Sequence, residues 1–130
     1  MTHEALEIAE NARAAANVCA AWILDELQRV LAAAPVARIA ISGGATPKLM
    51  FETLAKTPFA WNNVHVFWVD ERCVPPSDSR SNYRLANETW LEPARVPKEN
   101  IHRIKGELDP SQAAEDYVGD VRRSFRLGDG

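Results

Sequence analysis

Apolar and polar residues alternate with different periods along the chain, and each period predicts a different element of secondary structure. Residues 11–34 repeat apolar side chains at steps of three and four, which predicts a helix with one buried side. Asn11 is a suitable N-cap for this helix, and Pro35 marks its end. Before the helix, Leu6 and Ile8 alternate with polar residues and predict a short edge strand.

Two apolar runs in the middle of the chain predict buried strands. The run at residues 37–42 ends at a pair of glycines, and residues 46–56 after it predict a helix with Pro47 at its first position. Residues 64–69 are apolar on both faces apart from His65, which is typical of a parallel strand covered on both sides.

The last third of the chain continues the alternation of helix and strand. We predict a short helix at residues 81–91, a short strand at 100–104, and a helix at 109–125 capped by Asp109. Such alternation favours an α/β, Rossmann-like fold with a largely parallel sheet and helices on both faces. The length suits a single domain over residues 1–130.

The composition of the 130-residue chain is typical of a globular domain and limits the classes of partner that it could bind. Apolar residues make up 46% and charged residues 25%, and the net charge is −3. This balance argues against nucleic acid or an anionic membrane surface as a partner, because both reward a basic excess. No apolar run is long enough to cross a bilayer and no signal peptide is evident, so we expect a cytoplasmic protein. Cys19 and Cys73 lie far apart without metal-ligand spacing, which predicts free thiols and no metal site.

The stretch SGGATPK, residues 42–48, joins the first predicted strand to the next helix and is the first candidate site. Glycines let the backbone approach a ligand closely, and the first amides of a helix are free to bind an anion. The pattern matches neither the dinucleotide motif nor that of nucleotide hydrolases, so it suggests one phosphate on a small molecule. The alternative is a tight turn that binds nothing, with a lysine that is only solvated. The residues assigned to the phosphate site are Ser42, Gly43, Gly44, Thr46 and Lys48.

The second candidate site follows the second predicted strand. In an extended chain Asp70 and Arg72 fall on one side and Glu71 on the other. Asp70 can orient a water molecule or a sugar hydroxyl, and Arg72 can hold an anion or stabilise a developing oxyanion. Because ligands of parallel sheets collect at the carboxyl ends of strands, we expect both candidate sites at one edge. The alternative is an aspartate–arginine pair that only fixes the loop.

The sequence does not contain an obvious general base. His65 enters its strand at the amino end, opposite the candidate sites, and the position of His102 cannot be fixed from the sequence. Ser42 lacks the GxSxG context of a nucleophile, and no histidine is visibly paired with Cys73. None of these residues is a convincing base or nucleophile.

The motifs SGGATP (residues 42–47) and VDERCVPPSDSRSN (residues 69–82) together resemble the amino-terminal half of the 6-phosphogluconolactonase family. The first motif is shared with glucosamine-6-phosphate deaminases, but these typically carry Asp–Glu–Tyr where this chain has Asp–Glu–Arg. The resemblance implies hydrolysis of 6-phosphoglucono-1,5-lactone, a sugar phosphate, without a metal or organic cofactor. It also implies that Asp70 and Arg72 lie at the catalytic centre and that the glycine turn binds the substrate.

The family's general base is a histidine in a segment that residues 1–130 do not contain. We therefore expect this chain to be the N-terminal half of a longer sugar-phosphate hydrolase domain, with an incomplete sheet and no activity alone. We also expect Val66, Phe67 and Trp68 to be incompletely covered, because strands would be missing. Two alternatives are a glucosamine-6-phosphate deaminase or isomerase and a non-catalytic sugar-phosphate-binding domain. The oligomeric state stays open.

Overall fold

The computed structural model describes residue 6 and residues 8–126 of the chain. In chain order its helices and strands are α1 (Ala12–Ala33), β1 (Ala37–Ile41), α2 (Ala45–Ala55), β2 (Val64–Trp68), α3 (Asn82–Ala86), β3 (Ile101–His102) and α4 (Pro110–Phe125). A π-helical turn (Asn87–Leu91) continues α3, and short 3-10 turns (Trp61–Asn63 and Lys98–Asn100) precede β2 and β3.

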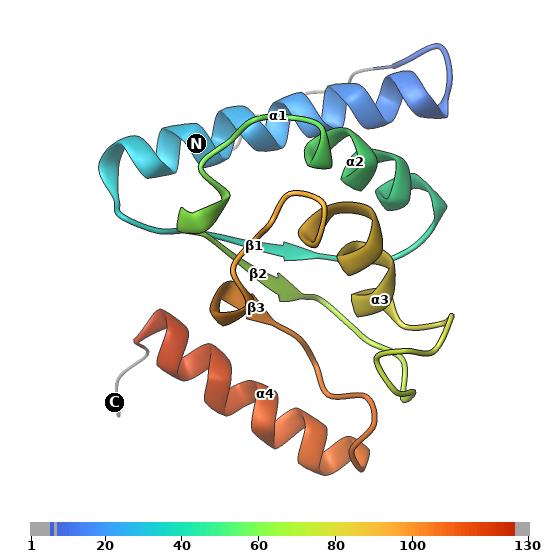
Figure 1. Ribbon diagram of the computed structural model, residues 1–130, viewed down its shortest axis with the longest axis vertical. Helices are drawn as coiled ribbons and strands as arrows, with labels where there is room; N and C mark the ends of the chain where they lie inside the picture. Colours follow the sequence, from blue (N-terminus) through green and yellow to red (C-terminus); the bar gives the residue numbers. More distant parts are fainter. Residues whose placement is uncertain (1–5, 7, 127–130) are drawn as a thin grey trace.

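These elements form three layers around a parallel sheet. The three described strands pair in the order β1-β2-β3, with Ile39 opposite Val66 and Phe67 opposite His102. Helices α1, α2 and α3 lie on one face of the sheet, and α4 lies on the other (Figure 1). The arrangement confirms the predicted α/β class with a parallel, open sheet and helices on both faces.

The hydrophobic core lies between the sheet and the layer of α1, α2 and α3. Ile41, Val66 and Trp68 point into this layer and are buried. Phe51 of α2 and Trp90 stack within it, with 5.6 Å between their ring centroids. Full burial of a phenylalanine side chain contributes about 1.5–3 kcal/mol, so this aromatic pair holds α2 against the turn that continues α3.

On the other face, α4 packs against β2 and β3 through aromatic and polar contacts. The Phe67 ring contacts His102 and Phe125, at centroid distances of 4.4 Å and 5.2 Å. The Tyr117 hydroxyl accepts a hydrogen bond from the Trp68 N–H (3.0 Å) and donates one to the Trp68 carbonyl (2.7 Å). Because β3 ends at His102, this hydroxyl satisfies backbone groups of β2 that a longer β3 would pair.

The helix caps predicted from the sequence are confirmed. The Asn11 side chain accepts a hydrogen bond from the Ala14 N–H at 2.8 Å, and α1 begins directly after it. The Asp109 carboxylate accepts one from the Ser111 N–H at 3.1 Å at the start of α4. Each cap satisfies a first-turn N–H that has no partner within the helix.

Several predicted boundaries shift, most by a single residue. Helix α2 begins at Ala45, one residue earlier than predicted, because Gly44 takes the cap position. Pro47 is therefore the third helical residue, where its missing N–H still removes no intrahelical hydrogen bond. The strand predicted at residues 100–104 shrinks to the two residues of β3.

The predicted edge strand near the N-terminus is wrong for the residues that the structure describes. Leu6 and Ile8 lie in irregular backbone and are 88% and 89% exposed. Alternation alone does not make a strand, because neither residue lies beside a strand with which it could pair. The rest of that stretch, residues 1–5 and 7, lies outside the described residues.

The expectation that Val66, Phe67 and Trp68 would be incompletely covered is also wrong. Their exposed fractions are 0%, 4% and 2%. The reason is the strand order: β2 is central in the described sheet, so helices cover both of its faces and strands flank both of its edges. In the sheet of the described residues, the outer edges of β1 and β3 have no strand beside them.

Candidate functional site

The carboxyl ends of β1 and β2 bring the two predicted sites into contact, and Asn82 joins them. Asn82 is only 3% exposed, and its side chain lies against Gly43. A Cβ atom at position 43 would lie 2.1 Å from the Asn82 Oδ1 atom, so the close approach requires glycine. The Asn82 Nδ2 group donates to the Asp70 carbonyl (3.3 Å) and to the Asp70 Oδ1 atom (3.4 Å). One side chain thus fixes the glycine turn against the strand end that carries Asp70.

The glycine turn, residues 42–48, ends in a helix start without a side-chain cap. Gly44 is the N-cap of α2 with a φ of 120°, a conformation that favours glycine. No side chain of the described residues caps α2, so its first amides are free to bind a ligand. Ser42, Thr46 and Lys48 are exposed around them. The positive end of the helix dipole and these polar groups suit a phosphate.

Glu71 organises the second half of the site. Its carboxylate accepts hydrogen bonds from the backbone N–H groups of Asn82 (2.7 Å), Tyr83 (2.9 Å) and Arg72 (2.8 Å). It also accepts one from the Ser81 hydroxyl at 3.1 Å. The charge therefore lies at the start of α3, and the carboxylate fixes the backbone on both sides of the loop.

Sequence reasoning missed this role of Glu71. It placed the side chain opposite Asp70 and Arg72 at a strand end but assigned it no partner. The partners at Ser81 and Asn82 lie ten and eleven residues further along the chain, which is outside the range of any local capping rule. Only the fold shows that a strand end caps the next helix.

Asp70 and Arg72 lie beside the hydrogen bonds of Glu71 and Asn82, and both side chains are exposed. The Arg72 Nη1 group donates to the Arg80 carbonyl at 3.0 Å, while the Asp70 carboxylate contacts Asn82. No ion pair joins Asp70 to Arg72 in the part of the chain that the structure describes. The two residues therefore do not fix the loop as an ion pair, but Arg72 does hold the loop through Arg80.

The loop after β2 is fixed at further points. A Cβ atom at Gly106 would lie 2.1 Å from the Arg72 carbonyl oxygen, so the loop lies directly on the backbone that follows β3. In the same loop the Asp78 carboxylate accepts hydrogen bonds from the Arg80 side chain and from its N–H, which lower the pKa of Asp78 to about 2. Both contacts limit how far Arg72 can move.

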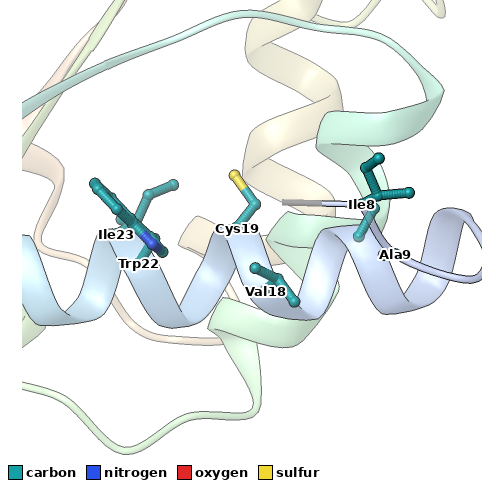
Figure 2. Close-up of a pocket in the computed structure, with 7 residues that line it drawn as sticks. Ile8, Ala9, Val18, Cys19, Trp22 and Ile23 are labelled. Atoms are coloured by element: carbon teal, nitrogen blue, oxygen red, sulfur yellow. The ribbon is translucent and has the colours of Figure 1, made fainter. Parts of the chain in front are cut away.

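A hollow of about 260 Å³ opens beside the glycine turn along the free edge of β1. Its polar lining comes from Ser42 and Thr46, and the rest is apolar, including Ile39 and Met50. A larger hollow of about 430 Å³ lies on the outer side of α1 between Ile8, Cys19 and Trp22 (Figure 2). It carries no charged side chain, so it does not suit a phosphate.

The histidines form a separate polar cluster far from Asp70 along the strands. His65 is the second residue of β2, and its Nδ1 atom lies 2.9 Å from the His102 Nε2 atom. The His102 Nδ1 atom lies 3.0 Å from the Asp120 carboxylate of α4. Burial, and then the neighbouring His102, lower the pKa of His65. His65 is thus at the amino end, as predicted, and the fold now places His102 beside it.

Residue 6 and residues 8–126 contain no group of three histidine, cysteine, aspartate or glutamate side chains placed to hold a metal ion. No helix among them is long and apolar enough to cross a membrane. Both cysteines are free and exposed, which confirms the predicted thiols.

A family model described as "Glucosamine-6-phosphate isomerases/6-phosphogluconolactonase" matches residues 10–129. The 6-phosphogluconolactonase of Haemophilus influenzae is 51% identical over 76 residues, which cover 55% of this chain and 33% of that protein. The 6-phosphogluconolactonase of Treponema pallidum is 33% identical over 109 residues, covering 82% of this chain and 45% of that protein. The chain spans less than half the length of these relatives.

Solved structures share the fold. The 6-phosphogluconolactonase of Thermotoga maritima superposes with a TM-score of 0.84 and 29% identity, covering 91% of this chain and 53% of that one. A monomeric glucosamine-6-phosphate deaminase superposes with a TM-score of 0.76 at 15% identity, which shows the fold alone. The match again covers about half of the longer chain, 49% for the deaminase.

Proposed function

Because the chain belongs to the family of glucosamine-6-phosphate isomerases and 6-phosphogluconolactonases, we propose that it supplies part of a 6-phosphogluconolactonase site. The reaction is hydrolysis of 6-phosphoglucono-1,5-lactone to 6-phosphogluconate. The observation that carries the proposal is the contact of Asn82 with both Gly43 and Asp70, which joins a phosphate-type turn to an acidic and basic strand end. We assign residues 1–130 to the N-terminal half of one longer domain in the cytoplasm.

We propose that the glycine turn binds the phosphate of the substrate. The free amides at the start of α2 and the Ser42 and Thr46 hydroxyls would donate to the phosphate oxygens, with Lys48 adding a positive charge. Gly43 and Gly44 allow the ligand to lie close to the backbone. This part of the site needs only described residues.

The lactone ring would then lie over the end of β2. In hydrolysis, water attacks the carbonyl carbon, a tetrahedral oxyanion forms, and the bond from that carbon to the ring oxygen breaks as this oxygen gains a proton. The Arg72 guanidinium has five N–H donors, one of them committed to Arg80, so others are available to stabilise the oxyanion. The Asp70 carboxylate would orient the water or a ring hydroxyl. We propose that the base that takes the proton of the water lies outside residues 1–130.

Comparison of two ligands tests the phosphate assignment. We expect 6-phosphogluconate, the stable product, to shift the backbone amide NMR signals of residues 42–46 and 48, whereas gluconate at the same concentration leaves them unchanged. Equal shifts with gluconate, or none with either ligand, would contradict a phosphate site in the turn. Glucosamine 6-phosphate serves as the third ligand, because preferential binding would favour the deaminase alternative.

Hydrolysis by the isolated chain tests the assignment of the base. We expect purified residues 1–130 to hydrolyse 6-phosphoglucono-1,5-lactone no faster than the spontaneous reaction in matched buffer. The rate is followed by proton release at constant pH, with a full-length relative as the positive control. A rate above the spontaneous one would show that residues 1–130 include a sufficient base.

A further inference from the structure

The main chain of Arg72 is fixed, so the position of its guanidinium depends on what holds the side chain. The Arg72 N–H donates to the Glu71 carboxylate (2.8 Å), and the Arg72 carbonyl accepts a hydrogen bond from the Val74 N–H (2.8 Å). The loop after β3 lies directly against this carbonyl, since a Cβ atom at Gly106 would be 2.1 Å from its oxygen. The side chain is exposed and has many rotamers, so a further contact is needed to keep it in one orientation.

Within the described residues, the Arg72 guanidinium has one hydrogen-bond partner, the Arg80 carbonyl. The Nη1 group donates to this oxygen at 3.0 Å. A carbonyl oxygen is a neutral acceptor, so it leaves the positive charge and the other N–H groups of Arg72 available to a ligand. Because the guanidinium is planar and rigid, the direction of the Arg80 carbonyl decides where these groups point.

Asp78 fixes the backbone on both sides of Arg80. The Asp78 Oδ1 atom accepts a hydrogen bond from the Arg80 N–H at 2.8 Å, which is the arrangement of an Asx turn. The Asp78 carbonyl accepts one from the Ser81 N–H at 3.0 Å. This N–H lies in the same rigid peptide plane as the Arg80 carbonyl and points in the opposite direction. The two peptide units that flank Arg80 are therefore both bonded to Asp78.

The loop that carries Asp78 has further contacts that keep its shape. Pro75 and Pro76 restrict the backbone at its start, and the Pro75 carbonyl accepts a hydrogen bond from the Asp78 N–H at 3.0 Å. The Arg84 Nη1 group donates to the Ser77 carbonyl at 2.8 Å, which ties the loop to α3. Asp78 thus has a fixed position from which it orients Arg80.

The Arg80 side chain folds back onto Asp78. Its Nε and Nη2 groups donate to the two carboxylate oxygens, at 3.1 Å each. The Arg80 side chain is 69% exposed, and ion pairs at the surface contribute little to stability. The main consequence of Asp78 is therefore the direction of the Arg80 carbonyl rather than the ion pair.

We propose that Asp78 is a positioning residue for Arg72 and acts through the Arg80 carbonyl. In this arrangement the backbone of Arg80 orients the Arg72 guanidinium, and the Arg80 side chain is dispensable. The use of Arg72 on an oxyanion rests on the proposed function, but the positioning of Arg72 by Asp78 does not.

Variants of the 130-residue chain separate the contributions of Asp78 and Arg80. Asp78→Ala removes the acceptor for the Arg80 N–H, whereas Asp78→Asn keeps an acceptor oxygen and loses only the charge. Arg80→Ala keeps the carbonyl and removes the guanidinium. Glu26→Ala is the matched control, because it breaks an exposed carboxylate–arginine pair with Arg29 on α1.

The measurement is the rate at which the Arg72 guanidinium rotates about its bond from Nε to Cζ, obtained by NMR of the side-chain nitrogens. A hydrogen bond at Nη1 slows this rotation. We expect Asp78→Ala to speed it by about two- to tenfold, the range that one hydrogen bond of ordinary net strength gives. Asp78→Asn, Arg80→Ala and Glu26→Ala should keep the parent rate. A role of Asp78 in stability alone would not change the rotation in the folded chain.

Three results would overturn the proposal. The first is an unchanged rate in Asp78→Ala, and the second is an equal increase in Asp78→Asn. The third is an equal increase in Arg80→Ala, because the Arg80 side chain would then be required. Asp78→Ser forms the same turn more weakly, so we expect an intermediate rate, and this variant replaces Asp78→Ala if that one does not fold.

Titration with two ligands separates this proposal from the proposed function. We expect Asp78→Ala to weaken the binding of 6-phosphogluconate by about two- to tenfold, because Arg72 would meet the carboxylate end of this product. The binding of inorganic phosphate should stay unchanged, because the variant does not alter the glycine turn. If the parent chain does not bind 6-phosphogluconate but the Arg72 rotation responds as expected, the proposed function is contradicted and the positioning of Arg72 by Asp78 stands.

Discussion

The two ends of the parallel sheet carry polar clusters of opposite character. At the carboxyl end, the cluster of Asp70, Glu71 and Asn82 supports a glycine turn whose helix start has no side-chain cap. At the amino end, the histidine cluster of His65 and His102 has its partners within the cluster and in α4. The carboxyl end thus leaves the first amides of α2 available to a ligand, whereas both ring nitrogens of His102 at the amino end are already engaged.

The difference separates residues that build a site from residues that stabilise the fold. Glu71 and Asn82 are committed to backbone groups and fix the geometry, whereas the exposed Asp70 and Arg72 keep groups available. The histidine cluster lies at the amino end of β2, away from Asp70 and Arg72, and both ring nitrogens of His102 are already engaged. For that reason the cluster is a poor candidate for the base, although histidine is the usual base.

The largest expected effect comes from Gly43→Ala, which breaks the contact between the two halves of the carboxyl-end cluster. The new Cβ would lie 2.1 Å from the Asn82 Oδ1 atom, and the buried Asn82 would lose its contacts with Asp70 as it moves. We expect a loss of about 2–3 kcal/mol in the free energy of unfolding, measured by urea denaturation.

Two companion variants test that explanation. Gly119→Ala in α4 meets only the mobile end of Arg123 at 3.3 Å, and helix propensity favours alanine there, so we expect no loss of stability. Adding Asn82→Ala to Gly43→Ala removes the clashing group, so the double variant should lose less than the sum of the two single losses. Additive losses would contradict direct contact as the cause.

Glu71→Gln is expected to have the next largest effect. The amide keeps the shape of the side chain but loses the charge and one acceptor oxygen, while the donors from Ser81, Asn82 and Tyr83 remain. We expect a loss of about 1.5–3 kcal/mol in the free energy of unfolding, with faster amide exchange at Asn82.

The matched control is Glu107→Gln, at another glutamate with a charged partner. Arg103 donates to its carboxylate at 2.8 Å and 2.7 Å, and these bonds lower the pKa of Glu107 to about 2. The pair lies at the surface, with Glu107 exposed and Arg103 half-buried, so we expect a loss below about 1 kcal/mol. If the two variants lose equal amounts, Glu71 is an ordinary surface carboxylate rather than the frame of the site.

How far the sequence predicts this molecule depends on the distance between the partners. The caps at Asn11 and Asp109 involve residues two or three positions apart, so local pattern suffices for them. The burial of both faces of β2 follows from its apolar run, which only His65 interrupts. The prediction of an edge strand at Leu6 and Ile8 was wrong because the alternation of apolar and polar residues does not show whether a pairing strand is present.

The candidate site shows the same limit. Ser42, Asp70 and Arg72 could be selected because strand ends are where parallel sheets bind ligands. The contacts that hold these residues in place could not be predicted, because Glu71 bonds to Asn82 eleven residues away. The same holds for the contact of His102 with Asp120, eighteen residues away in the histidine cluster. Such contacts depend on the order of the strands in the sheet, which the sequence does not reveal. The position of His102 and the identity of β1 as an edge strand could therefore not be predicted.

The smallest expected effect concerns pH and the histidine cluster. Burial and His102 lower the pKa of His65 in the folded chain, with Arg38 acting in the same direction and Asp120 and Glu99 opposing it. The folded state therefore binds fewer protons than the unfolded state just below the ordinary pKa of about 6.5. Stability from this group is present above that pH and is lost as the pH falls through the lowered pKa.

Urea unfolding at pH 8 and at successive steps down to pH 5 measures this loss. We expect His65→Asn to be less sensitive than the parent chain to the fall in pH, because its side chain cannot take up the proton. His3 lies outside the described residues and gives the control His3→Asn, which should keep the parent's pH dependence. If His65→Asn also keeps the pH dependence of the parent chain, other groups cause that dependence. The stability of the histidine cluster would then not depend on a neutral His65.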